Sequence, residues 1–224
     1  MEKLSNNCLI YFQITNWDQN KESTYIKYLS PDRKNRVNSS SSQNKPLLIF
    51  SEILIRIVAS KLLNIDYCEA TFSHNSYGKP YLSDYPNFHF NISHSNDTIV
   101  LLVSDSPVGV DIEYINEPCF KIVDRFFVEK EKDYINSDNN NKSIRFYEIW
   151  TRKEAYIKYL GKGLSIPLNS FNVFDSSIAP HFKTYYIDDY VISSFYKNCD
   201  SILAPIQITE MEINSFLHNI SIDK

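Results

Sequence analysis

The scarcity of glycine is the feature of this sequence that most restricts how it can fold. Only four glycines occur among 224 residues, at Gly78, Gly109, Gly161 and Gly163. Glycine adopts a positive φ without strain and lets one backbone approach another group closely. Because the chain makes its other turns with Asn, Asp, Ser and Pro, we expect a tight turn or a close approach at these four positions.

The composition is that of a folded protein and excludes several classes. Hydrophobic residues make up 43% and charged residues 22% of the chain, which is ordinary for a globular domain. A formal net charge of -4 argues against a protein whose main role is to bind the phosphate backbone of a nucleic acid. The longest apolar run, 47–58, contains Ser51, Glu52 and Arg56, so we expect neither a membrane span nor a signal peptide.

The cysteines give no sign of a metal site or a redox motif. They are far apart and form no Cys-x-x-Cys pair: Cys8, Cys68, Cys119 and Cys199. A reduced chain in the cytoplasm fits this pattern best.

The spacing of apolar residues predicts helices and strands in both halves of the chain. We expect helices over 21–29, 47–63 and 143–160, and strands over 8–15, 88–92, 98–103, 108–113, 170–174, 182–187 and 190–195. A basic turn is expected at 33–36 and a hairpin through 104–107. This mixture predicts an α+β fold of two similar lobes, 1–106 and 107–224.

Two carboxylates in the predicted strand 108–113 form the first candidate site. Side chains alternate along a strand, so Gly109, Asp111 and Glu113 share one face. Two carboxylates at this spacing can reach one hard cation, and oxygen ligands are what Mg²⁺ requires. The alternative is a strand end whose acids face water, and an Asp-x-Glu pair alone does not decide between them.

The predicted helix 143–160 supplies the second part of the site. Glu154 and Lys158 are four residues apart and share a face, with Trp150 one turn earlier. On its own this pair is better explained as a solvent-exposed ion pair that stabilises the helix by a few tenths of a kcal/mol. Gly161 is expected to end the helix in a left-handed conformation.

A series of motifs in one order resembles the Sfp-type 4′-phosphopantetheinyl transferases. The motifs are Tyr77-Gly78-Lys79-Pro80, Phe90-Asn91-Ile92-Ser93-His94-Ser95, Val108 through Glu113, Arg125-Phe126-Phe127 with Glu131, and Trp150 through Ser165. All four glycines fall inside them. The resemblance implies a monomer of two α/β lobes related by a pseudo-two-fold axis, with coenzyme A and Mg²⁺ bound in the cleft between the lobes.

The resemblance also implies roles for individual residues. Asp111, Glu113 and Glu154 would hold the metal ion. The remaining coenzyme contacts would come from Lys153 and Lys158 near the pyrophosphate, Asn91, Ser93 and His94 near a phosphate, and Tyr77, Gly78, Lys79 and Pro80 near the adenine.

The 3′-phosphate side matches the family less well. Arg33 and Arg36 match basic family positions that hold this phosphate, although a solvated basic turn explains them equally well. Leu47 stands where the family usually has an arginine. Either Lys45 substitutes for that arginine, or the phosphate is held less firmly.

The implied reaction transfers the 4′-phosphopantetheine group of coenzyme A to a serine hydroxyl of an acyl or peptidyl carrier protein and releases 3′,5′-ADP. Glu131 and Glu154 are both candidates for the general base, with Lys158 as the other catalytic residue. An apolar group between strand and helix, which would be either core or a carrier-docking patch, contains Phe120, Ile122, Val123, Phe126 and Phe127. The alternatives are another Mg²⁺-dependent nucleotide pyrophosphate enzyme, such as a coenzyme A hydrolase, and a non-catalytic carrier-binding module.

Overall fold

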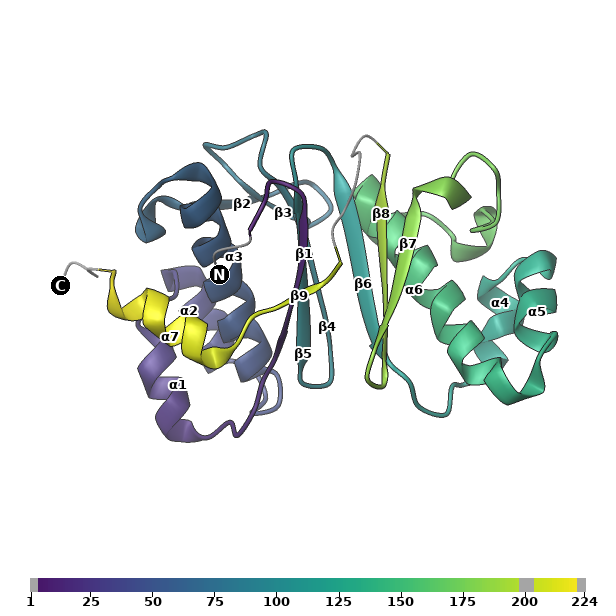
Figure 1. Cartoon of the computed structure of the whole chain (residues 1–224), viewed down its shortest axis with the longest axis horizontal. Helices are drawn as coiled ribbons and strands as arrows, with labels where there is room; N and C mark the ends of the chain where they lie inside the picture. The colour runs from purple at the N-terminus through teal and green to yellow at the C-terminus, as the bar shows by residue number, and fades with distance from the viewer. Residues whose placement is uncertain (1–3, 198–203, 221–224) are drawn as a thin grey trace.

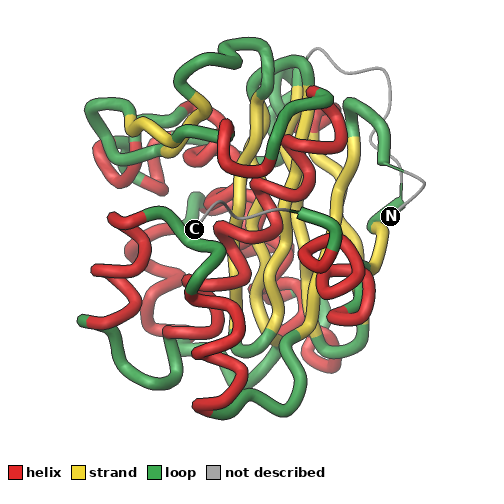
Figure 2. Tube along the Cα trace, turned by 90° about the vertical axis from the view of Figure 1, so that its left-hand side faces the viewer, coloured by secondary structure: helices red, strands yellow, loops and turns green. Residues whose placement is uncertain are grey.

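The computed structural model describes residues 4–197 and 204–220, which form four layers. Two β-sheets pack face to face in the middle, and helices cover the outer face of each sheet (Figure 1). A view turned by 90° shows the long strands running together with helices around them (Figure 2). Each half therefore has one sheet and one 19-residue helix, α3 (Lys45–Leu63) or α6 (Lys142–Leu160). The predicted α+β fold of two lobes is confirmed.

The remaining elements complete these layers. The strands are β1 (Cys8–Gln13), β2 (Phe72–His74), β3 (Pro80–Leu82), β4 (His89–Ser95), β5 (Thr98–Ser104), β6 (Val108–Tyr114), β7 (Phe182–Ile187), β8 (Tyr190–Tyr196) and β9 (Ile206–Gln207). The other α-helices are α1 (Gln19–Ile26), α2 (Pro31–Asn38), α4 (Val123–Phe126), α5 (Glu129–Asn136) and α7 (Glu210–His218). The sheet orders are β4-β5-β1-β9, β6-β8-β7 and, for a small hairpin, β2-β3.

Strand β1 shows why the layers form. Its apolar side chains occupy both faces, as expected for a strand between two apolar layers. Leu9 lies in the core between the two sheets, whereas Cys8, Ile10 and Phe12 lie in the core between the first sheet and α3. Continuous burial along β5 and β8 has the same origin.

The two long helices end as their sequences predict. The last residue of α3 is followed by Asn64 in the left-handed conformation, with φ of 53°, and α6 is followed by Gly161, with φ of 64°. Such residues are common just after a helix, because they turn the chain away without steric cost. The predicted helices 47–63 and 143–160 are therefore confirmed within two residues.

The predicted basic turn at 33–36 is wrong, because this segment is helix α2. Ser30 caps the helix by accepting a hydrogen bond from the amide of Arg33 at 3.2 Å, and Pro31 occupies the first turn. Both are typical helix-start signals. The turn signal at Ser30-Pro31 was thus the beginning of a helix rather than a break between elements.

The predicted hairpin through 104–107 is also wrong. Strand β5 pairs with β4, across a tight turn with Asn96 at φ of 50°, while β6 pairs with β8 in the second sheet. Residues 105–107 therefore carry the chain from one sheet to the other. Alternation shows that two segments are strands, but it does not identify their partners.

Residues 170–174 do not form the predicted strand. A short 3₁₀-helix, Leu168–Ser170, precedes them, and Phe171, Val173 and Phe174 pack in the core beside α6 and α5. Their β-like composition thus reflects burial rather than a strand.

The last described elements return to the first lobe. Strand β9 runs parallel to β1, with Ile10 opposite Ile206, and α7 packs on α3 through the buried Ile213 and Leu217. Residues 206–218 thus add to the first sheet and its core, and the division into 1–106 and 107–224 stays a prediction. Across the described ranges, no helix is both long and apolar enough to span a bilayer.

Candidate active site

The two lobes meet where β4 and β6 run beside each other. No sheet joins these strands, and polar side chains of β4 bond to β6 instead. Ser93 Oγ donates to Asp111 Oδ1 at 2.8 Å, and Ser95 Oγ donates to Glu113 Oε2 at 3.0 Å. Each carboxylate of β6 therefore has its own serine on β4, and the shared face predicted for Asp111 and Glu113 is confirmed by these parallel contacts.

Asn91 makes a third link of the same kind. Its side-chain Oδ1 accepts a hydrogen bond of 2.7 Å from the amide of Val110, and the side chain is buried. An unpaired edge amide is thereby satisfied without a strand partner. Asn91 and Ser93 are both among the contacts predicted for coenzyme A, and in the structure both side chains also join the two lobes.

Gly109 explains how α6 comes close to β6. A Cβ atom on Gly109 would lie 2.0 Å from the carbonyl oxygen of Ala155 and 2.5 Å from the amide nitrogen of Tyr159. Only a residue without a side chain permits this contact between backbones. The close approach holds Glu154 and Lys158 beside the carboxylates of β6.

Lys158 forms the centre of this arrangement. Its Nζ donates to Asp111 Oδ1 at 2.6 Å and to Ser93 Oγ at 2.7 Å. Asp111 is buried, and within the described part of the chain its second oxygen, Oδ2, has no hydrogen-bond partner. A buried carboxylate oxygen without a donor costs free energy, which is why such an atom indicates a ligand position.

Glu113 and Glu154 are held in an acidic environment. Burial and the nearby Asp111 carboxylate raise the pKa of Glu113, while hydrogen bonds from Ser95 and Trp150 oppose the rise. Burial and Asp111 likewise raise the pKa of Glu154, and Lys158 opposes this. Like charges that share a desolvated site favour protonation or the binding of a cation.

The fit to a metal ion is incomplete in this arrangement. Among the described residues, no group of three or more His, Cys, Asp or Glu side chains is gathered as a metal site. Three features still suit a divalent cation: the free oxygen of Asp111, the influence of the Asp111 charge on both Glu113 and Glu154, and the all-oxygen chemistry of the three side chains. Lys158 already supplies one positive charge to Asp111.

A pocket of about 250 Å³ opens beside these residues and is lined by both lobes. It contains many of the predicted site residues, Tyr77, Gly78, Lys79, Pro80, Asn91, Glu154 and Lys158, together with Ile157, Gly161 and Gly163. Three of the four glycines therefore line it. Clefts between lobes are a common place for ligand sites.

The β2–β3 hairpin forms one wall of this pocket. Tyr77 and Gly78 are exposed at its turn, and Gly78 has a φ of 86°, as predicted for a tight turn. Lys79 instead points inward, where its Nζ donates to the carbonyl oxygens of Val108 and Lys158. Burial and the neighbouring Lys158 lower the pKa of Lys79 to about 8.

His94 is exposed on β4, between Ser93 and Ser95. Partial desolvation of its ring and the nearby Lys158 ammonium lower the pKa of His94. The ring is therefore close to the Lys158 and Asp111 pair, although it does not line the pocket beside the hairpin.

The predicted 3′-phosphate residues are separated and partly paired. Arg33 Nε donates to the buried Glu52 at 3.2 Å, and Lys45 Nζ donates to Glu22 at 2.7 Å, while Arg36 is exposed. None of these three residues lines the pocket between the lobes. The structure does not gather them into one anion site.

Lys153 and Glu131 differ most from their predicted roles. Both side chains are completely buried, and Lys153 Nζ lies 2.8 Å from Glu131 Oε2. Lys153 also donates to the carbonyl oxygens of Leu168 and Phe171, and Glu131 accepts from the amide of Val173. All of these partners lie behind α6, so in this arrangement Lys153 does not reach a pyrophosphate and Glu131 does not reach a serine hydroxyl.

The apolar group predicted as core or docking patch is mostly core. Val123 and Phe127 are buried, and Phe120, Ile122 and Phe126 are partly buried against the same cluster. Trp150 stacks against this cluster, with its ring parallel to Phe146, while it also bonds to Glu113. The apolar cluster therefore fixes the Trp150 ring, which in turn bonds to the Glu113 carboxylate.

Sequence reasoning missed Ser95 and Asn75. Ser95 orients Glu113, and Asn75 bonds to the end of α6. The alternation of Asn91, Ser93 and Ser95 along one strand was the signal that would have revealed the first of these, because all three share one face.

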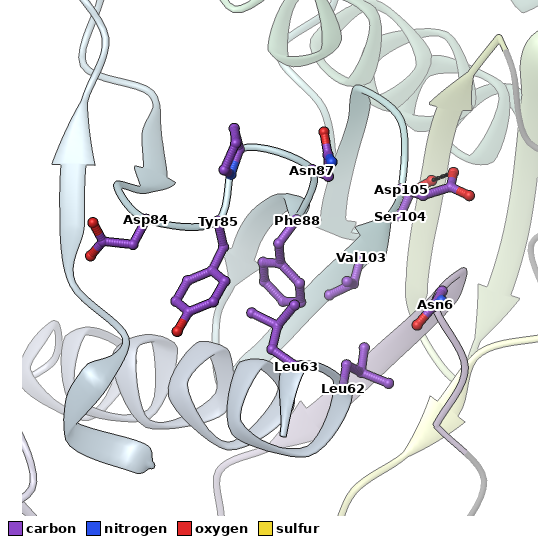
Figure 3. Close-up of a pocket in the computed structure, with 11 residues that line it drawn as sticks. Asn6, Leu62, Leu63, Asp84, Tyr85, Asn87, Phe88, Val103, Ser104 and Asp105 are labelled. Atoms are coloured by element: carbon purple, nitrogen blue, oxygen red, sulfur yellow. Dashed lines mark hydrogen bonds between the residues drawn. The ribbon is translucent and has the colours of Figure 1, made fainter. Parts of the chain in front are cut away.

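A larger cavity lies elsewhere and is lined by none of the predicted site residues. It measures about 450 Å³ and lies between the end of α3 and the loop before β4, where Leu62, Leu63 and Phe88 line it (Figure 3).

Comparison with known proteins gives a consistent assignment. Residues 15–106 match the family model described as 4′-phosphopantetheinyl transferase, N-terminal, and residues 107–200 match that of the 4′-phosphopantetheinyl transferase superfamily. The chain is 33% identical to 4′-phosphopantetheinyl transferase Sfp of Bacillus subtilis, over 69% of this chain and 70% of that protein. It is 38% identical to 4′-phosphopantetheinyl transferase gsp of Aneurinibacillus migulanus, over 71% of this chain and 62% of that protein.

A more distant relative matches as well. The chain is 31% identical to an L-aminoadipate-semialdehyde dehydrogenase-phosphopantetheinyl transferase of Xenopus laevis, over 70% of this chain and 58% of that protein. Since two family models cover successive halves of the sequence and the match to Sfp spans most of both proteins, the chain belongs to the 4′-phosphopantetheinyl transferase superfamily, as its Sfp-type motifs predicted.

Proposed function

We propose that this protein transfers the 4′-phosphopantetheine group of coenzyme A to a serine hydroxyl of an acyl or peptidyl carrier protein. The serine oxygen forms a bond to the β-phosphorus of coenzyme A, the bond from that phosphorus to 3′,5′-ADP breaks, and the serine proton passes to a base. One observation carries the proposal: Lys158, Asp111 and Glu154 lie together beside a pocket that both lobes line.

Asp111, Glu113 and Glu154 are the residues that would hold Mg²⁺. The free buried oxygen of Asp111 and the raised pKa values of both glutamates support this assignment. When bound, the ion would neutralise negative charge on the pyrophosphate. Ser93 and Ser95 then orient two of the three carboxylates from β4.

Lys158 contributes a cation at the same place. The Lys158 side chain is 27% exposed and lies at the boundary between the buried carboxylate and the pocket. Phosphoryl transfer depends mainly on positioning and on charge stabilisation rather than on covalent participation by the protein. A lysine that reaches from Asp111 toward a phosphate oxygen supplies both.

Glu154 is the general base that the geometry favours. It lines the pocket, where a carboxylate can reach the serine hydroxyl of a carrier protein. Glu131 is buried behind α6 and bonded to Lys153, so the arrangement supports Glu154 over Glu131.

The coenzyme is proposed to lie along the pocket from the carboxylates to the hairpin. Tyr77, Gly78 and Pro80, which line the pocket, would contact its adenine, and His94 would contact a phosphate. Arg33, Arg36 and Lys45 remain the proposed basic residues for the 3′-phosphate, which requires Arg33 and Lys45 to leave Glu52 and Glu22. A monomer in the cytoplasm completes the proposal.

Intact-mass measurement tests this function. Apo carrier proteins are incubated with the protein, coenzyme A and Mg²⁺, and the expected result is a carrier heavier by one phosphopantetheine with release of 3′,5′-ADP. Release of 3′,5′-ADP without a carrier would indicate a hydrolase instead, and binding without a mass change would indicate a non-catalytic module. An Asp111→Ala variant that keeps full transfer while folded would refute the carboxylate assignment.

A further inference from the structure

The turn of the β2–β3 hairpin is attached to the end of α6 by two side chains. Asn75 Nδ2 donates to the carbonyl oxygen of Gly161 at 2.9 Å. Lys79 Nζ donates to the carbonyl oxygen of Lys158 at 2.6 Å and to that of Val108 at 3.0 Å. The hairpin belongs to the first half of the chain, whereas all three acceptors belong to the second.

These contacts satisfy groups that a helix leaves unpaired. The last four carbonyl groups of an α-helix have no partner within the helix, and its C-terminus carries a partial negative charge. Lys158 is two residues from the end of α6, and Gly161 follows it. A lysine ammonium and an amide NH₂ are therefore suited to this position, and among the salt bridges of the described residues Lys79 has no carboxylate partner.

Asn75 also holds the turn in shape. Its Oδ1 accepts from the amides of Tyr77 and Lys79, both at 2.9 Å. One side chain thus forms the turn with its oxygen and attaches it to α6 with its nitrogen. A hairpin of only three residues a strand is marginally stable by itself, so these contacts decide where it lies.

The attachment also reaches the carboxylate site. Lys79 binds the backbone of Lys158, whose ammonium lies on Asp111. It also lies at the boundary between two cavities, the pocket with Glu154 and a second one of about 340 Å³ lined by Tyr85, Phe90 and Tyr159. The Lys79 ammonium thus donates to two backbone carbonyl groups of the second lobe, at the edge of the first pocket.

We propose that the side chains of Lys79 and Asn75 act as positioning groups, which fasten the β2–β3 hairpin to the C-terminal end of α6 and so fix the pocket wall against the other lobe. The effect on coenzyme binding rests on the proposed function. The fastening itself does not, because it is a property of the ligand-free chain.

Hydrogen exchange of the ligand-free protein tests the fastening. In Lys79→Met and in Asn75→Ala, amides of residues 72–82 and 158–161 are expected to exchange at least about tenfold faster than in the wild type, since each loses a buried hydrogen bond. Exchange in β1, β5 and β8 stays unchanged. Lys162→Met, which removes an exposed lysine just after α6, is the matched control and leaves the hairpin unaffected.

Steady-state kinetics separates positioning from ligand contact. We expect both variants to raise the KM for coenzyme A about tenfold with a smaller change in kcat, and Lys79→Arg to recover part of the loss. Unchanged exchange in the hairpin of both variants would overturn the proposal, as would a raised KM in Lys79→Met alone with wild-type exchange. If the protein has no transferase activity, the hydrogen-exchange result still tests whether the hairpin is attached to α6. If Lys79→Met does not fold, Asn75→Ala tests the same attachment.

Discussion

Lys158 Nζ lies 2.6 Å from Asp111 Oδ1, so an ammonium from α6 neutralises the buried carboxylate of β6 in the ligand-free protein. Ser93 bonds to both groups and fixes their orientation. The second oxygen of Asp111 stays without a partner in the described structure. Lys158 and a divalent cation would therefore interact with the same carboxylate, that of Asp111.

This relationship predicts the behaviour of Lys158→Met. Removing the ammonium leaves Asp111 without its positive partner, so the variant should bind Mg²⁺ alone about tenfold more tightly than the wild type, a difference of about 1.4 kcal/mol. Transfer should nevertheless fall by about 100-fold, because a cation near the phosphate is lost. Calorimetric titration with Mg²⁺ and the mass assay measure the two effects. Weaker binding of Mg²⁺ by the variant would contradict the shared-carboxylate interpretation.

Gly109→Ala should destabilise the whole protein. The added Cβ would meet backbone atoms of Ala155 and Tyr159, which cannot rotate away. We expect a loss of about 3 kcal/mol, at the upper end of the usual range for overpacking. Chemical denaturation measures the loss.

Gly78→Ala is the matched control for that variant. Its Cβ would meet nothing within 4 Å, and only the positive φ of 86° opposes the change. The expected cost is about 1–2 kcal/mol. An equal loss in the two variants would show that contact with α6 is not the reason for glycine at position 109.

The buried pair Lys153 and Glu131 should control stability rather than transfer. Either Lys153→Met or Glu131→Gln leaves one buried group without its partner and should cost about 3–5 kcal/mol. Replacing both residues by apolar ones should recover part of that loss. Denaturation midpoints of the single and double variants test this, and a folded Glu131→Gln protein without transfer would instead support Glu131 as the base.

Lys79 predicts a dependence of stability on pH. Its pKa is lowered to about 8 in the folded protein, by burial and by Lys158, against an ordinary value of about 10.5 when unfolded. The unfolded chain therefore binds more protons between these values, so this residue makes the protein more stable as pH rises from about 8 to 10.5, by at most about 1.4 kcal/mol per pH unit.

Tyrosines and other lysines titrate in the same pH range. The difference in unfolding free energy between the wild type and Lys79→Met isolates the contribution of Lys79 from theirs. Two titratable side chains interact with the Lys79 ammonium, those of Lys158 and His89, and the lowered pKa of His89 keeps its ring neutral in this pH range. Denaturation curves at pH 7.5, 9 and 10.5 should show a steeper gain in the wild type. A gain of the same slope in the variant would contradict the lowered pKa.

The cysteines should differ in reactivity. Burial raises the pKa of Cys8 to about 11, whereas Cys68 and Cys119 are exposed. Only the thiolate is nucleophilic, so iodoacetamide at pH 8 should modify Cys68 and Cys119 and leave Cys8 intact until the protein is denatured. Peptide mapping after brief treatment measures this, and early modification of Cys8 would show that β1 opens readily.

The sequence by itself determined the elements and most of the site. A short apolar run identified β1, alternation identified β6, helical spacing and end signals identified α3 and α6, and the ordered motifs identified the family. These signals are local, because each depends on residues a few positions apart or on a short motif. The scarcity of glycine also indicated Gly109 and Gly161, whose roles the structure explains by close approach and by a left-handed end.

Only the tertiary structure decided which elements are partners and which charges are buried. The chain carries no local signal that β6 leaves β5 for β8, because strand pairing depends on contacts between distant residues. Glu131 and Glu154 look alike in sequence, yet one is buried beside Lys153 and the other lines the pocket. Desolvation and a charged partner from another element distinguish the two glutamates. Both arise only after the layers have packed.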